Sequence, residues 1–131
     1  MLAEVLLPGM ANKVLLIEDD PFLGSLLGNR FKRESIDAVT VKNGNEAIKA
    51  MKAQLFDLVL LDLILPGKSG FEVLEEIKAD PQISKVPVVI ISNLGQESDV
   101  VKGKELGAAD YIIKAKISID EMVKKVKDYL K

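Results

Sequence analysis

Acidic, hydroxyl and ammonium side chains stand where four apolar runs of this chain end. Glu18 and Asp19 follow one run, and Asp62, Ser92 and Lys114 each follow another. If the runs are neighbouring parallel strands, their carboxyl ends meet at one edge of a sheet, and these groups share a pocket. Three carboxylates at short range repel one another, and a hard cation such as Mg²⁺ relieves that repulsion. The pattern predicts a pocket for a divalent cation and a phosphoryl group.

The predicted pocket combines a carboxylate nucleophile, a metal ion and an ammonium group. In-line phosphoryl transfer to an aspartate requires that set, because the cations neutralise the phosphoryl oxygens while the carboxylate attacks. Each residue alone has an ordinary explanation, such as a solvated acidic loop for residues 18–20 or a helix cap for Ser92. Their joint placement at the ends of separate strands favours the functional interpretation.

Composition narrows both the class of protein and its chemistry. The 131 residues suit one domain, 48% of them are apolar, and the net charge is -2. A disordered chain is disfavoured, and we expect no direct contact with nucleic acid. The chain contains neither cysteine nor histidine. This excludes thiol catalysis, disulfides, histidine general bases and a phosphohistidine of its own, so any phosphoryl group must come from another molecule.

The apolar runs alternate with amphipathic stretches, which is typical of βαβ units and a parallel sheet. We expect strands at residues 14–17, 38–41, 58–61, 86–91 and 110–113. Right-handed crossovers would place five helices on both faces of an open, doubly wound α/β sheet. The fourth helix, at about residues 96–106, is expected to be marginal or mobile because it contains Gly103 and few apolar residues.

Residues 1–11 are expected to form a poorly ordered N-terminal tail, with the domain at residues 12–131. The tail is too short to cross a membrane, and Glu4 stands where a signal peptide would be basic. No other segment is a candidate membrane span, so we expect a cytoplasmic protein without membrane contact.

Four motifs together resemble the response-regulator receiver domain of two-component signalling, the family that includes the chemotaxis response regulator. The resemblance covers about residues 13–130. It implies a flavodoxin-like fold with strand order 2-1-3-4-5. In chain order the motifs are Leu16-Ile17-Glu18-Asp19-Asp20-Pro21, Leu61-Asp62-Leu63-Ile64-Leu65-Pro66 with Gly70, Ile91-Ser92, and Tyr111-Ile112-Ile113-Lys114.

The resemblance also implies a role for each residue of the pocket. Asp62 would be the phosphoacceptor. Asp62, Asp19 and the backbone carbonyl of Ile64 would bind Mg²⁺, and Glu18 would bind it largely through water. Lys114 would pair with a phosphoryl oxygen.

A switch is implied as well. Ser92 would turn inward to bond the phosphoryl group, and Tyr111 would follow it from an outward to a buried position. That movement would alter the face built from the fourth helix, the fifth strand and the last helix.

The chain departs from the family pattern after two of the motifs. Ala115 follows Lys114, where the family usually has proline after a cis bond. Either this bond is cis, at a cost of roughly 2.5–4 kcal/mol, or the loop is trans and Lys114 sits slightly differently. Asn93 replaces a usual alanine or glycine and is expected to narrow access to the acceptor. Ile64 and Leu94 flank the route of an attacking water without being able to bond to it, which predicts slow hydrolysis of the acyl phosphate.

The leading hypothesis is a phosphorelay switch rather than a metabolic enzyme. A histidine kinase or histidine phosphotransfer protein would phosphorylate Asp62, and the altered surface would control an unidentified protein target. The domain would catalyse only its own phosphorylation and slow dephosphorylation, as a monomer or as a phosphorylation-dependent dimer. The sequence leaves open whether it acts alone or belongs to a longer protein.

Two alternatives use the same fold. One is a receiver-like binding module that never uses phosphate. The other is an enzyme or cofactor protein on a similar sheet. An acidic loop after the first strand disfavours a flavin phosphate, and the residues after Asp62 lack the second acid of aspartate-based phosphatases.

Overall fold

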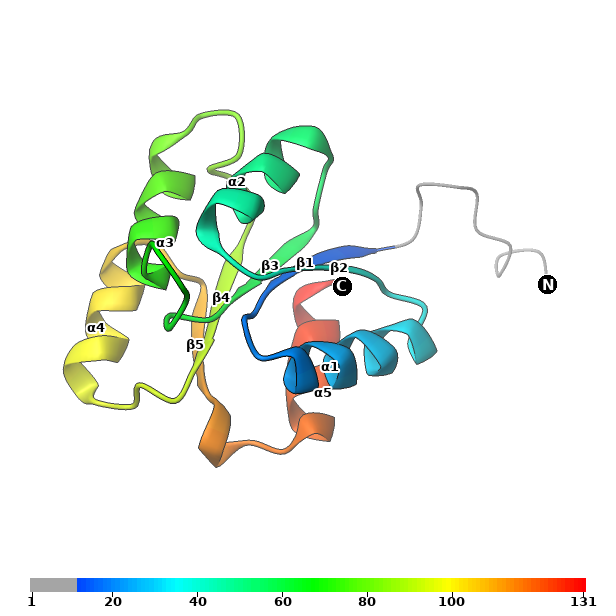
Figure 1. The fold of residues 1–131 in the computed structure, drawn as a ribbon. Coiled ribbons are helices and arrows are strands. Elements are labelled where there is room, and N and C mark those ends of the chain that lie inside the picture. Colours follow the sequence, from blue (N-terminus) through cyan, green and yellow to red (C-terminus); the bar gives the residue numbers. More distant parts are fainter. Residues whose placement is uncertain (1–11) are drawn as a thin grey trace.

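The computed structural model describes residues 12–131, so the expected tail at residues 1–11 lies outside the described residues (Figure 1). Its centre is a five-stranded sheet in the order β2-β1-β3-β4-β5, with every neighbouring pair parallel. This confirms the predicted fold class and strand order. The strands are β1 (Lys13–Ile17), β2 (Asp37–Val41), β3 (Leu58–Leu61), β4 (Val88–Ser92) and β5 (Asp110–Ile113).

Five α-helices alternate with the strands, as the sequence predicted. Figure 1 shows α1 and α5 covering one face of the sheet, and α2, α3 and α4 covering the other. The fourth helix is present, and a short 3-10 helix, η1, follows the last strand. The bounds are α1 (Pro21–Arg33), α2 (Gly44–Ala53), α3 (Gly70–Ala79), α4 (Glu97–Glu105), η1 (Lys114–Lys116) and α5 (Ile119–Tyr129).

Two apolar cores hold the helices against the sheet. Successive residues of a strand point to opposite faces, so Leu15 and Ile17 enter one core while Val14 and Leu16 enter the other. Strand β3 is buried along its whole length, as expected for a central parallel strand. Burial of each large aliphatic side chain contributes about 1.5–3 kcal/mol, so these strands form a firm base for the loops at their ends.

The register aligns the carboxyl ends of the strands. Ile17 pairs with Leu61, so the residues that follow β1 and β3 emerge side by side. Ser92 pairs with Ile113 across β4 and β5. The edge of the sheet therefore collects the polar residues that the sequence placed after the apolar runs.

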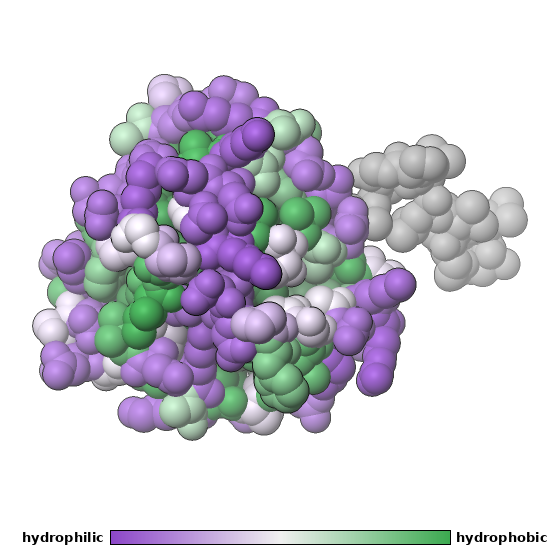
Figure 2. All heavy atoms as spheres, in the orientation of Figure 1, coloured by the Kyte–Doolittle hydropathy of each residue, from purple (hydrophilic) through white to green (hydrophobic). Residues whose placement is uncertain are grey.

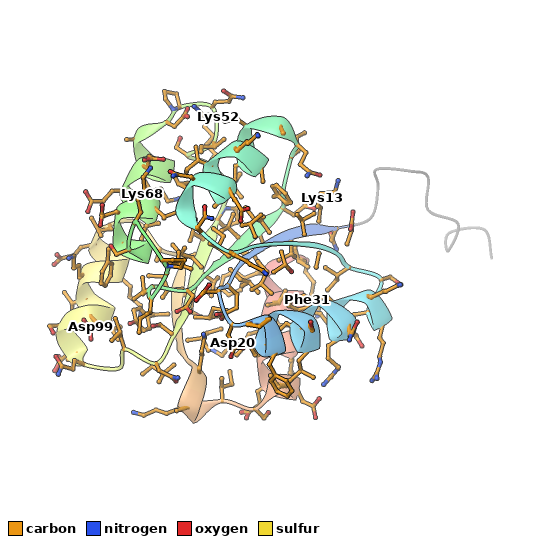
Figure 3. All side chains as sticks on the ribbon, viewed as in Figure 1. Lys13, Asp20, Phe31, Lys52, Lys68 and Asp99 are labelled. Atoms are coloured by element: carbon orange, nitrogen blue, oxygen red, sulfur yellow. The ribbon has the colours of Figure 1, made fainter. Side chains whose placement is uncertain are left out.

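Local signals set where the elements begin. Pro21 opens α1, and the side chain of Asp20, labelled in Figure 3, caps this helix by accepting a hydrogen bond from the Phe22 N–H. Strand β4 begins at Val88 rather than at the predicted residue 86. Pro87 has no N–H to donate, although its carbonyl still accepts a bond from the Val59 N–H.

The surface is dominated by polar residues. Figure 2 shows one face on which hydrophilic side chains prevail, with smaller hydrophobic patches between them. Within residues 12–131, every helix is too short or too polar to cross a membrane.

Candidate functional site

Glu18, Asp62 and Lys114 meet at the carboxyl edge of the sheet. The Nζ atom of Lys114 lies 2.6 Å from Oε1 of Glu18 and 3.1 Å from Oδ2 of Asp62. Glu18 directly follows β1, Asp62 directly follows β3, and Lys114 directly follows β5. The structure thus brings together three of the residues that the sequence analysis selected, and it joins two carboxylates through one ammonium group.

Glu18 is held rigidly by its backbone and its side chain. Its N–H donates to the Val41 carbonyl at 2.9 Å, and its Oε2 accepts from the Asp20 N–H at 3.1 Å. Only 2% of its surface is exposed. Burial raises the pKa of Glu18 above its ordinary value of 4.5, while the hydrogen bond from Lys114 opposes the rise. A buried carboxylate with this tendency needs a positive partner.

Asp62 lies at the start of the β3–α3 loop and is 6% exposed. Its N–H donates to the Ile17 carbonyl at 3.0 Å, and its Oδ1 accepts from the Ile64 N–H at 3.3 Å. Its other carboxylate oxygen faces Lys114. The carboxylate therefore has a fixed orientation within the group.

Gly70, the first residue of α3, packs closely against the loop that carries Asp62. Its N–H donates to the Leu63 carbonyl at 2.8 Å, and a Cβ atom at Gly70 would lie 2.3 Å from the Asp62 carbonyl oxygen. Only a residue without a side chain permits that approach. Gly70 belongs to the second sequence motif, but its role could not be predicted because the contact depends on how α3 docks.

Lys114 reaches both acids from a trans peptide bond. Residues 12–131 contain no cis peptide bond, so the bond to Ala115 takes the trans alternative left open by the sequence. Burial alone would lower the pKa of Lys114, but hydrogen bonding to Glu18 and the charges of Asp62 and Glu18 outweigh it and raise that pKa. Lys114 is therefore a cation at neutral pH, and it offsets part of the repulsion between the two carboxylates.

The third predicted carboxylate does not join this group. Asp19 is exposed, and within residues 12–131 no three acidic side chains are arranged so that they could hold a metal ion. Instead, the structure pairs Glu18 and Asp62 around Lys114. Mg²⁺ is commonly held by one or two carboxylates, with waters and phosphate oxygens completing its shell, so this buried pair suits the ion chemically. Metal ligation by Asp19 stays a prediction.

Ser92 is the last residue of β4, and Tyr111 lies on the neighbouring strand β5. Ser92 is fully buried, and its Oγ accepts a hydrogen bond from the Leu94 N–H at 3.2 Å. The Tyr111 hydroxyl donates to the Leu94 carbonyl. Burial, followed by the charge of Asp99, raises the pKa of Tyr111 above 10.0. Both predicted switch residues thus contact the same loop residue at the end of β4.

The residues around the mouth of the site differ in exposure. Ile64 is 60% exposed, Asn93 is exposed, and Leu94 is half-buried. A groove of about 400 Å³ also opens beside Glu18, between α1 and the end of β2. Its lining is mostly small or polar, and consists of Glu18, Asp20, Pro21, Gly24, Ser25, Gly28, Asn29, Thr40 and Lys42.

Comparison with known proteins places this geometry in a family. Residues 14–127 match the family model described as the response regulator receiver domain. The phosphate regulon transcriptional regulatory protein PhoB of Rhizobium meliloti is 33% identical over 122 residues, which are 93% of this chain and 53% of that protein. The chain thus spans about half the length of this relative.

Solved structures agree with the family match. The BeF3-activated N-terminal receiver domain of RstA from Klebsiella pneumoniae has a TM-score of 0.83 and 28% identity, covering 92% of this chain and 99% of that one. The Mn(2+)-bound form of the response regulator Rcp1 has a TM-score of 0.76 and 30% identity, covering 89% of this chain and 92% of that one.

Proposed function

The chain belongs to the response regulator receiver domain family, and on this premise we propose that it is a phosphorylation switch whose acceptor is Asp62. The observation that carries the proposal is the group formed by Glu18, Asp62 and Lys114, in which Lys114 lies within 3.1 Å of both carboxylates. A buried carboxylate with a neighbouring ammonium and a second acid is suited to accept a phosphoryl group.

In this proposal a carboxylate oxygen of Asp62 attacks the phosphorus of a phosphohistidine on another protein. The new O–P bond forms as the N–P bond to imidazole breaks, and the imidazole leaves with its electron pair. Lys114 already lies 3.1 Å from Oδ2 of Asp62, so its ammonium can pair with an oxygen of the incoming phosphoryl group. This charge lowers the barrier because negative charge gathers on those oxygens.

Glu18, Asp62 and the carbonyl of Ile64 are proposed ligands of a divalent cation, and Asp19, which is exposed here, would turn toward them when the ion binds. A bound Mg²⁺ would supply further positive charge to the phosphoryl oxygens. The Mn²⁺-bound relative supports a divalent ion in this fold, and the buried acid pair supports its location here. The Ile64 N–H donates to Asp62, so the loop that offers the carbonyl is tied to the acceptor.

The proposed switch runs through Ser92 and Tyr111. Ser92 would leave its bond with the Leu94 N–H and donate to the phosphoryl group. Tyr111 holds the carbonyl of the same Leu94, so a movement of this loop would change the position of its ring. The surface built from α4, β5 and α5 would then present a different shape to a protein target.

The proposed phosphodonor is a histidine kinase or a histidine phosphotransfer protein, since the chain itself has no histidine. The downstream target is unidentified. We propose a protein rather than nucleic acid as the direct partner of residues 12–131, with either a monomer or a phosphorylation-dependent dimer as the acting form. A cytoplasmic location is part of the same proposal.

The acyl phosphate should persist once formed. The apolar side chains of Ile64 and Leu94 cannot hydrogen-bond to an attacking water, and hydrolysis is slower when that water is not oriented. The half-life is measured by following the loss of phosphoryl mass without any phosphatase. A half-life of a few seconds would contradict this part of the proposal.

Intact mass measurement with Mg²⁺ and acetyl phosphate tests the proposal. The expected result is a gain of one phosphoryl group that disappears in Asp62→Asn. Asp57→Asn is the matched control, because Asp57 is an exposed acid at the opposite end of the same strand. If the native chain gains no mass under conditions that phosphorylate another receiver, a binding module that does not use phosphate becomes the better explanation.

A further inference from the structure

Helix α4 is attached to the rest of the domain in an unusual way. Gly103 is its buried residue, whereas Val101 is 46% exposed and Val100 is half-buried. Helices α3 and α5 instead bury several large apolar side chains each. In α4, therefore, the helix backbone itself approaches the core.

The contacts at Gly103 show what this backbone rests on. A Cβ atom placed there would lie 2.6 Å from Cδ1 of Ile90 and 3.1 Å from Cδ2 of Tyr111. The first atom is the end of a flexible side chain, but the second belongs to a rigid aromatic ring. Gly103 therefore leaves just enough room for the Tyr111 ring to lie under α4.

Tyr111 contacts the same part of the molecule at a second point. Its hydroxyl donates to the carbonyl of Leu94, in the loop that leads from β4 to α4. One side chain thus touches the middle of α4 through its ring and the segment before α4 through its hydroxyl. A movement of this side chain would alter both supports together.

We propose that Gly103 is a positioning residue that couples Tyr111 to α4. Because Gly103 has no side chain, the Tyr111 ring can pack directly against the helix backbone. If the ring moved away, α4 would lose the packing contact beneath it. This helix would then be destabilised more than any other helix of the domain. A larger residue at Gly103 would displace the ring or lift the helix. The consequence for signalling rests on the proposed function, whereas the coupling itself is a property of the unphosphorylated chain.

A matched pair of glycine substitutions tests the coupling. A Cβ atom added at Gly28, inside α1, would have no atom within 4 Å. Gly28→Ala should therefore gain helix propensity without a clash. Gly103→Ala gains the same propensity but meets both the end of the Ile90 side chain and the Tyr111 ring. We expect Gly28→Ala to raise the melting temperature, and Gly103→Ala to lower it or leave it unchanged while hydrogen exchange of the α4 amides accelerates.

The titration of Tyr111 and hydrogen exchange in Tyr111→Leu test the same coupling independently. In a Tyr129→Phe background, ultraviolet absorbance follows the ionisation of Tyr111 alone, since these are the two tyrosines of the chain. Displacement of the ring by Gly103→Ala should shift this titration to lower pH. Tyr111→Leu adds no clash and removes the aromatic ring that packs under α4. It should therefore accelerate hydrogen exchange of the α4 amides, while the β1 and β3 amides stay protected.

All of these measurements use unphosphorylated protein without metal, so failure of the coupling is distinct from failure of the phosphoacceptor role. If Gly103→Ala stabilises as much as Gly28→Ala and leaves the Tyr111 titration unchanged, the coupling is wrong. The same holds if Tyr111→Leu leaves exchange in α4 unchanged. If Gly103→Ala does not fold, the exchange result for Tyr111→Leu decides alone.

Discussion

The Nζ atom of Lys114 lies 2.6 Å from Oε1 of Glu18, although 96 residues separate the two in the sequence. Lys127 and Glu34 form an ion pair of the same length on the surface. The two pairs differ in burial, because the Glu18 side chain is 1% exposed and that of Glu34 is 30% exposed. Solvent screens the second pair, so we expect the first to matter far more for stability.

Lys114→Met should therefore destabilise the domain strongly. Loss of the ammonium leaves Glu18 and Asp62 buried and facing each other, and breaking such a pair costs about 3 kcal/mol. Lys127→Met is the matched control and should change the free energy of unfolding by less than about 1 kcal/mol. Urea unfolding at neutral pH measures both, and added Mg²⁺ should restore part of the loss in Lys114→Met alone. Equal effects of the two substitutions would contradict the account.

Glu18→Gln should weaken divalent cation binding. The amide keeps an oxygen that can accept from Lys114, but the second negative charge of the site is lost. A supporting ligand of this kind is worth about tenfold or more in metal affinity. Mn²⁺ binding followed by electron paramagnetic resonance or calorimetry measures the effect, with Glu34→Gln as the control at a surface carboxylate. Unchanged affinity in Glu18→Gln would exclude Glu18 from the cation site.

Gly70→Ala should disturb the loop that carries Asp62. The new Cβ atom would meet the Asp62 carbonyl oxygen at 2.3 Å and the Leu63 Cα at 2.5 Å, and neither is a flexible side-chain end. Overpacking of this kind costs about 1–3 kcal/mol. Urea unfolding should show the loss, and phosphorylation by acetyl phosphate should slow. Gly28→Ala is the control, and a Gly70→Ala protein as stable and as reactive as the native chain would show that the approach is not tight.

The stabilising contribution of Glu121 should be lost in acid. Hydrogen bonds from Ser118 at the start of α5 lower the pKa of Glu121 below its ordinary 4.5. A carboxyl group whose pKa is lowered by folding adds stability above pH 4.5, and this stability is lost as the pH falls through the folded value. Glu121→Gln should therefore lower the melting temperature at pH 7, and the difference should shrink steadily as the pH falls below 4.5. Glu75→Gln, at an exposed site in α3, controls for the charge, and a constant difference across this range would refute the prediction.

The arrangement of the fold could be predicted from the sequence because it follows from local patterns. Strand β3 is apolar throughout, Pro21 opens α1, and the parallel register then brings Glu18 and Asp62 to one edge. The start of β4 was predicted too early because Val86 and Pro87, directly before the strand, are also apolar. These results depend on short-range rules of backbone bonding and side-chain burial.

The details of the site could not be predicted in the same way. The preference of Lys114 for Glu18 depends on how its long side chain settles between two acids, and the exposure of Asp19 depends on the path of the loop after β1. The contacts of Gly70 and Gly103 arise only when α3 and α4 dock on the sheet. Such contacts depend on tertiary packing to within tenths of an ångström, which periodicity does not reveal.

The position of the phosphoryl group can be determined chemically. The protein is phosphorylated with acetyl phosphate and Mg²⁺ and then reduced with sodium borohydride, which converts an aspartyl phosphate to homoserine. Peptide mass spectrometry then identifies the modified position. We expect modification at Asp62 alone, whereas modification at Asp19 or Asp20 with Asp62 intact would show that Asp62 is not the phosphoacceptor.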